Sequence, residues 1–441
     1  MNRVCLIDLP GLSRELLAHI PADSGLGRWI AQQRIQSLSP SWPAVTCSVQ
    51  ATLTTGQPPA RHGIVSNGVA TYRSPADAAL VDASNFADYR RNVSFWEQSN
   101  QFLGVPRFWQ NEDGKSKYKT ALLFFQHSMP GFAGTPRPAA DVVLTPKPDH
   151  GPDGKLVSLC WSNPPDLVPR LFKEFGPFPL MNYWGPMAGI ASSQWIAKAA
   201  AAVWQTEKPT LQLVYVPHLD YDLQRFGPGS PQARKAVVDV AAAIEPLLQA
   251  VLNDGGKLLV LSEYTIDPVD RSIAPNALLR DAGLLTTLPT PDGEQIDYRR
   301  SKAFAMVDHQ IAHLYSSEPS AADLLRNAGL SILDRSVLPH PRAGDFLLEA
   351  PAGAWLDYRW WKNPADAPSF ATAVDIHRKP GYDPLELFFN PAARSIAQDA
   401  SLVRGSHGRT SGSKAIFAGH SPSSDNAVEM WHVRSVVEKL L

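Results

Sequence analysis

The chain has 441 residues, 44% of them hydrophobic, and a formal net charge of -1. This apolar content is enough for a large buried core, whereas the near-zero charge excludes the bulk cationic field of proteins that bind nucleic acid or anionic membranes. Three cysteines are too few for a disulfide framework. No apolar run approaches the ~20 residues that span a bilayer, and no secretory segment precedes the first strand, so we expect a cytoplasmic protein.

The predicted elements alternate between strands and helices. Val4 to Asp8 is an apolar run that a Pro-Gly turn follows, after which Ser13 caps a helix from Arg14 to His19. Apolar strands that alternate with helices are typical of a mostly parallel sheet covered by helices. The later predicted strands are Leu211 to Val216, Lys257 to Leu261 and Lys414 to Ala418, and the later helices are Ala233 to Leu252 and Ala427 to Leu441.

Two stretches interrupt this alternation. Asn85 to Pro186 is rich in Pro, Gly and Trp, and Leu285 to about Ala400 mixes short strands with loops. We interpret both as cap insertions within a single domain of residues 1–441. In open α/β sheets, ligands bind at the carboxyl ends of the strands, so the caps are expected to cover that edge.

Two side chains are predicted to lie at this edge. Asp8 ends the first predicted strand. Thr46 follows Pro43 and precedes a helix-like stretch, which places it at a helix N-terminus. Free N–H groups and the helix dipole there favour a phosphate group or a Thr alkoxide. A Thr at such a position also commonly serves only as a helix cap.

The order of these residues resembles the start of the type I phosphodiesterase/nucleotide pyrophosphatase family, within the alkaline phosphatase superfamily. The matching residues, in chain order, are Asp8, Thr46, Thr55-Gly56, His62-Gly63-Ile64 and Asn67. The resemblance implies an alkaline-phosphatase-like α/β/α sandwich of three layers. It also implies that Thr46 is the nucleophile, that Asp8 and Thr46 bind one of two zinc ions, and that Asn67 and the Cys47 N–H bind the phosphoryl oxygens. In this comparison His62 has a structural role.

A middle segment departs from the family pattern. The family has an Asp after a strand and a His four residues later, both on one zinc ion. If Asp220 is that Asp, a Gly-Pro pair also matches, and the His position holds Gln224. If Asp222 is the Asp, the His position holds Phe226. His218 is either a replacement ligand, since on an extended chain it lies on the side of Asp220, or a neutral His packed in the loop.

The remaining family positions are partly retained. Glu263 and Tyr264 follow a predicted strand where the family has an Asp and a His on the other zinc ion. Glu is an oxygen ligand of longer reach, whereas Tyr is a poor zinc ligand because its pKa is ~10. A late Ser-His-Gly sequence matches the family's late His, so the resemblance implies that His407 binds the same ion as Asp220.

Two other histidine clusters contain candidates for the missing imidazoles. His309 belongs to a predicted strand in which His309 and His313 share one face and Asp308 lies on the other. His377 lies in a polar loop and precedes two basic residues, which either meet an anionic substrate or face the solvent. Both histidines also suit a buried hydrogen-bond network.

The resemblance therefore implies a metal-dependent phosphoester hydrolase with two divalent ions, expected to be zinc because the ligands mix nitrogen and oxygen. The implied ligands are Asp8, Thr46 and Glu263 for one ion, and Asp220 and His407 for the other, with His309 and His377 as candidate substitutes. The expected partner is a small phosphodiester or, as an alternative, a phosphonate whose C–P bond is cleaved. The missing histidines also fit a non-catalytic protein that binds a phosphorylated ligand.

Overall fold

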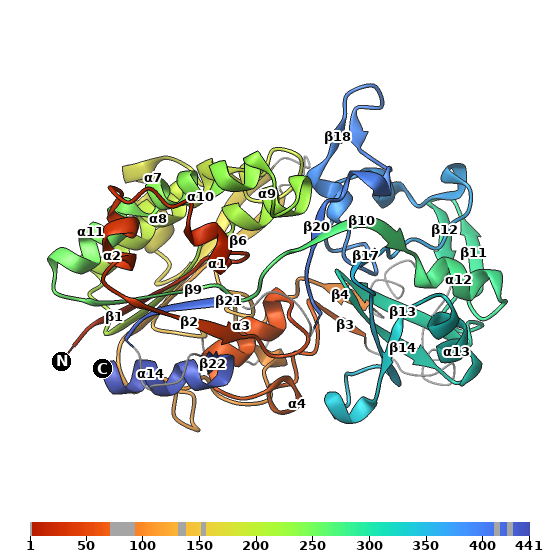
Figure 1. The fold of residues 1–441 in the computed structure, drawn as a ribbon, viewed down its shortest axis with the longest axis horizontal. Coiled ribbons are helices and arrows are strands. Elements are labelled where there is room, and N and C mark those ends of the chain that lie inside the picture. The colour runs from red at the N-terminus through yellow and green to blue at the C-terminus, as the bar shows by residue number, and fades with distance from the viewer. Residues whose placement is uncertain (1, 71–92, 131–137, 151–155, 410–414, 421–426) are drawn as a thin grey trace.

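The computed structural model describes residues 2–70, 93–130, 138–150, 156–409, 415–420 and 427–441. A larger body surrounds a central sheet and carries both ends of the chain, and a smaller body lies beside it (Figure 1). The smaller body is built mainly from segments between Pro275 and Tyr382, which form a hydrophobic core of their own.

The central sheet has nine strands in the order β22-β2-β21-β9-β1-β8-β5-β6-β7. Five of its eight neighbouring pairs run parallel, which confirms the predicted mostly parallel sheet. The strands are β1 (Val4–Asp8), β2 (Arg34–Ser39), β5 (Thr120–Leu123), β6 (Val142–His150), β7 (Leu156–Asn163), β8 (Leu211–Tyr215), β9 (Lys257–Leu261), β21 (Ala415–Gly419) and β22 (Ala427–Glu429).

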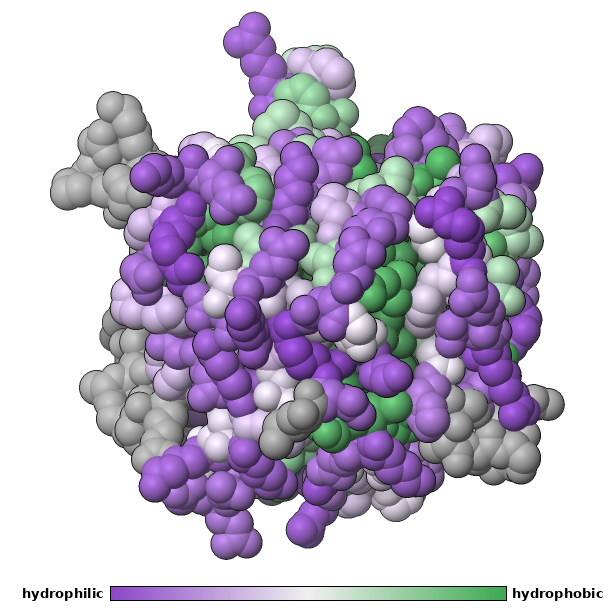
Figure 2. Space-filling model, turned by 90° about the vertical axis from the view of Figure 1, so that its left-hand side faces the viewer, coloured by the Kyte–Doolittle hydropathy of each residue, from purple (hydrophilic) through white to green (hydrophobic). Residues whose placement is uncertain are grey.

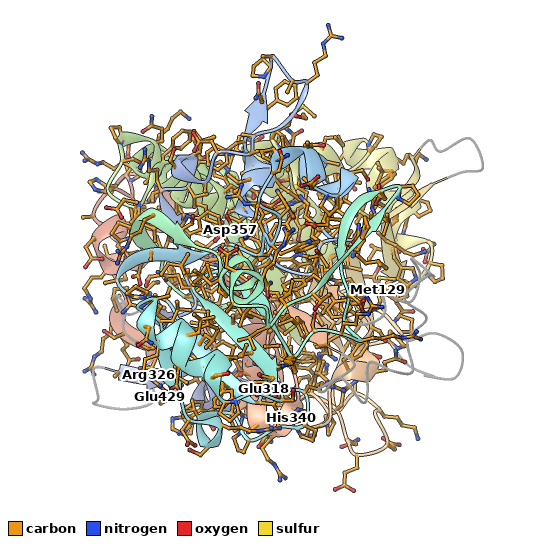
Figure 3. All side chains as sticks on the ribbon, turned by 90° about the vertical axis from the view of Figure 1, so that its right-hand side faces the viewer. Met129, Glu318, Arg326, His340, Asp357 and Glu429 are labelled. Atoms are coloured by element: carbon orange, nitrogen blue, oxygen red, sulfur yellow. The ribbon has the colours of Figure 1, made fainter. Side chains whose placement is uncertain are left out.

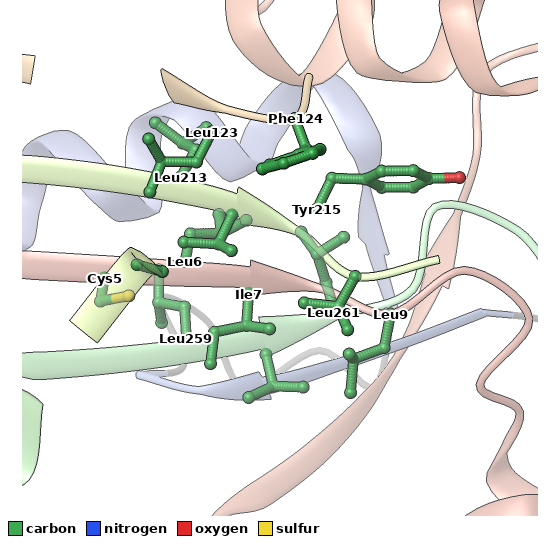
Figure 4. Close-up of a cluster of buried hydrophobic side chains, with 14 of the residues drawn as sticks. Cys5, Leu6, Ile7, Leu9, Leu123, Phe124, Leu213, Tyr215, Leu259 and Leu261 are labelled. Carbon is green, nitrogen blue, oxygen red and sulfur yellow. The ribbon is translucent and has the colours of Figure 1, made fainter. Parts of the chain in front are cut away.

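The middle of this sheet is apolar on both faces. Every residue of β1 is buried, and Leu6 is in register with Leu213 of β8 and Leu259 of β9. Figure 4 shows these side chains packed together, with the Tyr215 ring extending past them at the end of β8. Continuous apolar runs suit strands that helices cover on both sides.

Helices form the two outer layers of a three-layer sandwich, as the resemblance predicted (Figure 1). One layer contains α1 (Arg14–Leu17), α2 (Gly25–Ile30), α7 (Leu167–Phe175), α8 (Ile190–Thr206), α9 (His218–Phe226), α10 (Pro231–Ala243) and α11 (Glu245–Asn253). The other contains α3 (Thr46–Thr55), α4 (Pro59–His62) and α14 (Val433–Leu440). No single described helix is long and apolar enough to cross a membrane, and only the bent pair α10–α11 reaches that length and composition.

Three sequence-based expectations differ from the structure. Residues 85–186 contain β5, β6 and β7, so much of this expected cap belongs to the central sheet; residues 85–92 lie outside the described ranges, as does Lys414. The long helix predicted from Ala233 is divided at Ile244, because Pro246 cannot continue a helix. The predicted last helix begins only at Val433, since residues 427–429 pair with β2.

The smaller body contains a four-stranded antiparallel sheet in the order β13-β14-β16-β15. Figure 3 views the smaller body end on, with Glu318 just before the start of α13 and Arg326 near its other end. Its elements are α12 (Pro275–Asp281), β11 (Thr287–Thr290), β12 (Gly293–Ile296), β13 (Ala303–Asp308), β14 (Ile311–Ser316), α13 (Ser320–Asn327), β15 (Ser331–Leu333) and β16 (Phe346–Glu349).

Short sheets lie between the two bodies. They are β10 (Asp267–Ile273) with β17 (Gly353–Leu356) and β20 (Gly405–Ser406), and β3 (Gly68–Ala70) with β4 (Val93–Phe95). Because β1 runs from the end that carries the N-terminus toward the smaller body, the carboxyl edge of the sheet faces that body (Figure 1). The opposite end of the molecule is mainly hydrophilic (Figure 2).

Candidate active site

The site begins where three neighbouring strands end together. The parallel register pairs Asp8 of β1 with Tyr215 of β8 and Leu261 of β9. The chain after β9 continues directly into Glu263 and Tyr264. The residues expected at the carboxyl edge from sequence therefore meet there, as strand ends of parallel sheets do.

Thr46 is the first residue of α3, as predicted, and its side chain is 3% exposed. The preceding Val45 provides no side-chain cap, and the Thr46 Oγ1 lies 3.0 Å from the Tyr264 hydroxyl. The hydroxyl group of Thr46 is therefore part of the site and is not spent on capping α3.

Asn67 connects Cys47, the residue after Thr46, to Asp308 of the smaller body. The Cys47 N–H donates to the Asn67 Oδ1 over 2.8 Å, and the Asn67 Nδ2 donates to the Asp308 Oδ1 over 3.1 Å. The other oxygen of Asp308 accepts from the Asn67 N–H (2.8 Å) and the Ser66 hydroxyl (2.5 Å). The sequence placed Cys47 and Asn67 against phosphoryl oxygens, and here they are bonded to each other.

Asp8 and Glu263 form a buried acidic pair. Both are completely buried, and no N–H or O–H donor is in hydrogen-bonding geometry with any of their four carboxyl oxygens, although the Thr46 hydroxyl lies close to Glu263. Burial raises the pKa of Asp8 to about 8. Burial also raises the pKa of Glu263, and the charges of Asp8 and Asp220 raise it further, while the Thr46 hydroxyl opposes the rise. Unpaired buried carboxylates are costly unless a proton or a cation neutralises them.

Asp220 is equally buried but has partners. Its Oδ2 accepts from the Gln224 Nε2 over 2.7 Å, and its Oδ1 accepts from the Tyr264 hydroxyl over 3.3 Å. The Tyr382 hydroxyl donates to the Gln224 Oε1 over 2.6 Å. Burial raises the pKa of Asp220 to about 6, and His309 and these two donors oppose the rise.

His309 and His407 lie side by side in a stack of four rings. Tyr264 stacks on His407 with centroids 3.6 Å apart, His407 lies 3.8 Å from His309, and His309 stacks on Tyr382 at 3.5 Å. The Nδ1 of His407 lies 2.7 Å from the Ala44 carbonyl oxygen, and that of His309 lies 2.6 Å from the Asp308 Oδ1. Holding Nδ1 in this way leaves Nε2 as the potential ligand atom.

The position of His309 corrects the strand predicted around it. Asp308 ends β13 and His309 lies in the turn to β14, with φ of +58°. His309 and His313 therefore do not share one strand face, and His313 instead bonds to the Val65 carbonyl oxygen and the Gly344 N–H. A non-glycine residue in this backbone region is strained, and such residues gather at functional sites.

The other candidates for missing ligands differ in position. His377 is exposed, lines the same pocket as Thr46, and bonds to the Phe95 carbonyl oxygen through Nδ1. His218 begins helix α9, so it and Asp220 lie ~200° apart around the helix axis rather than on one side. The expected extended chain was wrong because this segment is helical.

The two basic residues after His377 do not line this pocket. Lys379 is 1% exposed and pairs with Asp383 (2.8 Å) and Glu386 (2.6 Å). Arg378 pairs with Asp375. Of the two alternatives left open for these residues, substrate contact and solvent exposure, the structure supports neither for Lys379.

The pocket above the site is open to solvent, spans about 880 Å³ of space including that open part, and is rich in aromatic residues. Seven of its described lining residues are Trp or Tyr, and none of the described ones is Lys or Arg. The Trp-rich stretch noted at residues 85–186 supplies Trp96 and Trp184 to this wall, whereas Tyr382 and the other tyrosines that complete it, apart from Tyr264, were not singled out from the sequence. The lining aromatic residues are Trp96, Tyr183, Trp184, Tyr215, Tyr221, Tyr264 and Tyr382.

The two groups of carboxyl oxygens differ in how well they could bind a cation. Asp8 and Glu263, with the Thr46 hydroxyl beside them, offer unpartnered oxygens that fit one divalent ion. The oxygens of Asp220 already accept hydrogen bonds. Within the described ranges no group of three or more His, Cys, Asp or Glu residues is arranged to hold a metal ion. This absence applies to both groups of oxygens, so the difference rests on the hydrogen bonds: the oxygens of Asp220 are engaged and do not fit a second ion as they stand, whereas those of Asp8 and Glu263 are free of such bonds.

The fold and the site define an α/β sandwich of the alkaline phosphatase type with a polar site at the carboxyl edge of the sheet. The sequence matches the model of the type I phosphodiesterase/nucleotide pyrophosphatase family over residues 4–383, so the chain belongs to this family. Membership places it in a class of metal-dependent phosphoester hydrolases. None of the curated protein sequences matches the chain.

Solved structures agree on the fold. Phosphonoacetate hydrolase from Sinorhizobium meliloti 1021, bound to phosphonoformate, is similar with a TM-score of 0.60 and 14% identity, over 100% of this chain and 96% of that one. Murine ectonucleotide pyrophosphatase/phosphodiesterase 5 is similar with a TM-score of 0.58 and 14% identity, over 99% and 94%. An inactive variant of the murine protein was solved with AMP. At this identity the similarity concerns the fold.

Proposed function

We propose that this chain is a cation-dependent hydrolase of a small phosphodiester and that Thr46 is its nucleophile. The observation that carries the proposal is the buried pair Asp8 and Glu263, whose oxygens form no hydrogen bond of good geometry and lie beside the Thr46 hydroxyl. Acidic groups of this kind are retained at functional sites rather than for stability.

The negative charge around the pocket supports the proposal that a cation is needed for an anionic substrate to bind. A phosphoryl group that reaches Thr46 approaches three buried carboxyl groups, Asp8, Asp220 and Glu263, and no described lining residue is Lys or Arg. Like charges at this range repel strongly inside a protein. A divalent ion held by Asp8, Glu263 and the Thr46 Oγ1 would neutralise the carboxylates and favour the alkoxide form of Thr46.

The residues of the chain would then act as follows. The Thr46 Oγ1 attacks phosphorus, an Oγ1–P bond forms, the bond from phosphorus to the departing alkoxide breaks, and the proton released from the Thr46 hydroxyl is taken up by that alkoxide. Water later cleaves the phosphothreonine and restores the hydroxyl group. The N-terminus of the ten-residue helix α3 favours the phosphoryl anion through its dipole and through first-turn N–H groups other than that of Cys47, which donates to Asn67.

Asn67 would orient the phosphoryl group. Asp308 accepts one hydrogen of the Asn67 amide, so the second hydrogen is available to a phosphoryl oxygen. The Cys47 N–H fixes the amide by donating to its oxygen. Cys47 would therefore act through Asn67, rather than by touching the substrate as the sequence suggested.

The aromatic pocket supports an ester substrate more than a carboxylated phosphonate. Rings of Trp and Tyr bury an apolar or planar group well, and such a group fits the alcohol portion of a diester. A phosphonate with a carboxylate would need a basic residue beside it, and none of the described lining residues supplies one.

The test is hydrolysis of bis-p-nitrophenyl phosphate by the purified chain, after treatment with EDTA and again after adding Mn²⁺, Mg²⁺ or Zn²⁺. We expect turnover only with a cation. Thr46→Val keeps the shape and removes the nucleophile, so turnover should disappear, whereas Thr46→Ser should retain part of it. Equal rates in Thr46→Val and wild type, or no turnover with any phosphodiester or phosphonoacetate, would overturn the proposal. The second result would favour the non-catalytic binding protein.

A further inference from the structure

The site has two halves, Asp8 with Glu263 and Asp220 with its neighbours, and the two differ in the hydrogen bonds that their carboxyl groups accept. Asp8 and Glu263 have no donor, whereas both oxygens of Asp220 accept hydrogen bonds from uncharged groups. All three side chains are at least 95% buried, so solvent exposure does not explain the difference. The cause lies in what Gln224 and Tyr264 provide.

The donors to Asp220 belong to a closed network. Gln224 donates through its Nε2 and accepts from the Tyr382 hydroxyl through its Oε1, so both ends of its amide are engaged. Tyr264 bonds to Asp220 and also to Thr46, at 3.3 and 3.0 Å. Because the polar groups of Gln224, Tyr264 and Tyr382 all have hydrogen-bond partners, the network holds this buried polar cluster in one arrangement.

Ring packing fixes the network in place. Tyr264 lies flat on His407 with an interplanar angle of 8°, and Tyr382 lies on His309 at 17°. The two hydroxyl groups therefore approach Asp220 and Gln224 from rings that have little freedom to turn. An ion at Asp220 would have to displace one of these hydroxyl groups or the Gln224 amide.

The side chains that stand in place of the family's histidines, Gln224 and Tyr264, are weak metal ligands. A carboxamide and a neutral phenol bind divalent ions less well than imidazole does, and a closed protein site for zinc uses about four strong ligands. Hydrogen bonds from uncharged donors stabilise one carboxylate at Asp220 without any ion. No comparable donor reaches Asp8 or Glu263 within the described residues.

We infer that the network of Gln224, Tyr264 and Tyr382 takes the place of a second metal ion at Asp220, so that the site binds a single divalent cation, at Asp8 and Glu263. This inference rests on the cation site of the proposed function. Because the ligands at Asp8, Glu263 and Thr46 are all oxygen atoms, the cation is a hard one such as Mn²⁺ or Mg²⁺ rather than zinc.

The first experiment counts bound ions without using turnover. The EDTA-treated chain is titrated with Mn²⁺ by calorimetry, and the stoichiometry is checked by native mass spectrometry. We expect one ion per chain, and loss of that ion in Glu263→Gln. Two tightly bound ions in the wild type would overturn the inference and leave the proposed function intact. No bound ion would overturn both.

The second experiment restores the stronger ligands. The double variant Gln224→His, Tyr264→His should bind two ions per chain and should develop an intense visible absorption with Co²⁺, because tetrahedral sites that contain imidazole absorb more strongly than octahedral oxygen sites. Gln126→His is the matched control: Gln126 lines the same pocket but bonds to Gln98 and not to Asp220, so its count should stay at one.

The remaining outcomes also decide the question. A double variant that melts like the wild type and still binds one ion would overturn the role of the network. If the double variant does not fold, Gln224→His alone, which keeps Tyr264, is measured in the same way, and the wild-type count remains decisive. A wild-type count of two that falls to one in His309→Ala would overturn the inference and assign His309 as the substitute ligand.

Discussion

Asp8 ends β1, and Asp220 lies in the first turn of α9, which follows the neighbouring strand β8. Both are almost completely buried, yet only Asp220 accepts hydrogen bonds of good geometry. Burial raises the pKa of each, to about 8 for Asp8 and to about 6 for Asp220. The difference between Asp8 and Asp220 shows that burial of a carboxyl group alone does not define a cation site. What matters is whether the protein itself supplies a donor for each buried oxygen.

The largest difference between the two residues should be in turnover. Asp8→Asn removes a proposed ligand of the cation and keeps the shape of the side chain, so we expect a loss greater than the ~10- to 100-fold that an outer-shell partner costs. Asp220→Asn should lose less, because neutral donors already hold this side chain. Initial rates with saturating Mn²⁺ measure both.

The same pair of variants has an internal control. Calorimetric titration should show a strongly reduced affinity for Mn²⁺ in Asp8→Asn and a nearly unchanged affinity for Mn²⁺ in Asp220→Asn. If Asp220→Asn weakens Mn²⁺ as much as Asp8→Asn does, the two halves of the site act alike and the comparison fails.

The second prediction concerns pH and the acidic pair. In the unfolded chain Asp8 titrates near ~4, and burial raises the pKa to about 8 in the folded chain. Between these values the folded chain binds more protons, so the free energy of unfolding falls as pH rises, by up to ~1.4 kcal/mol per pH unit for one proton. The stability is fully present below the lower value and is lost as pH rises through the upper one.

Thermal melting in EDTA, from about pH 5 to about pH 9, measures this loss. We expect the Tm of the wild type to fall across the range and the Tm of Asp8→Asn to fall less. Added Mn²⁺ should flatten the wild-type curve, because the cation binds the ionised carboxylates. A wild-type Tm in EDTA that does not change with pH would contradict the unpaired state of Asp8.

The sequence predicted the frame of the site better than its interior. Strand-terminal Asp8, helix-initiating Thr46 and the position of Glu263 after β9 follow from local patterns, because parallel strands bring their carboxyl ends to one edge. Local patterns also predicted β1, β8 and β9 within one or two residues.

The remainder depended on contacts that local patterns do not encode. The stack of Tyr264, His407, His309 and Tyr382 joins four distant segments, and no spacing rule links them. The turn at His309 was interpreted as part of a strand because apolar runs lie directly before Asp308 and directly after Gln310. The expected cap of residues 85–186 failed for a related reason, since its Pro and Trp residues concealed three strands of the main sheet, β5, β6 and β7.

The smallest expected effect comes from the outer end of the Asp220 network. Tyr382→Phe removes one hydroxyl group and leaves the ring on His309, so the Gln224 Oε1 loses its donor. An unsatisfied buried acceptor costs about 1–3 kcal/mol, and Tm should fall accordingly. Because Gln224 is then free to turn away, Asp220 should hold its proton or a cation more readily, while the Mn²⁺ ion at Asp8 stays in place. Phe304→Leu, in the separate core of the smaller body, is a destabilised control. Calorimetric titration should show the same Mn²⁺ affinity at Asp8 in both variants, and a weaker Mn²⁺ ion in Tyr382→Phe but not in Phe304→Leu would contradict this prediction.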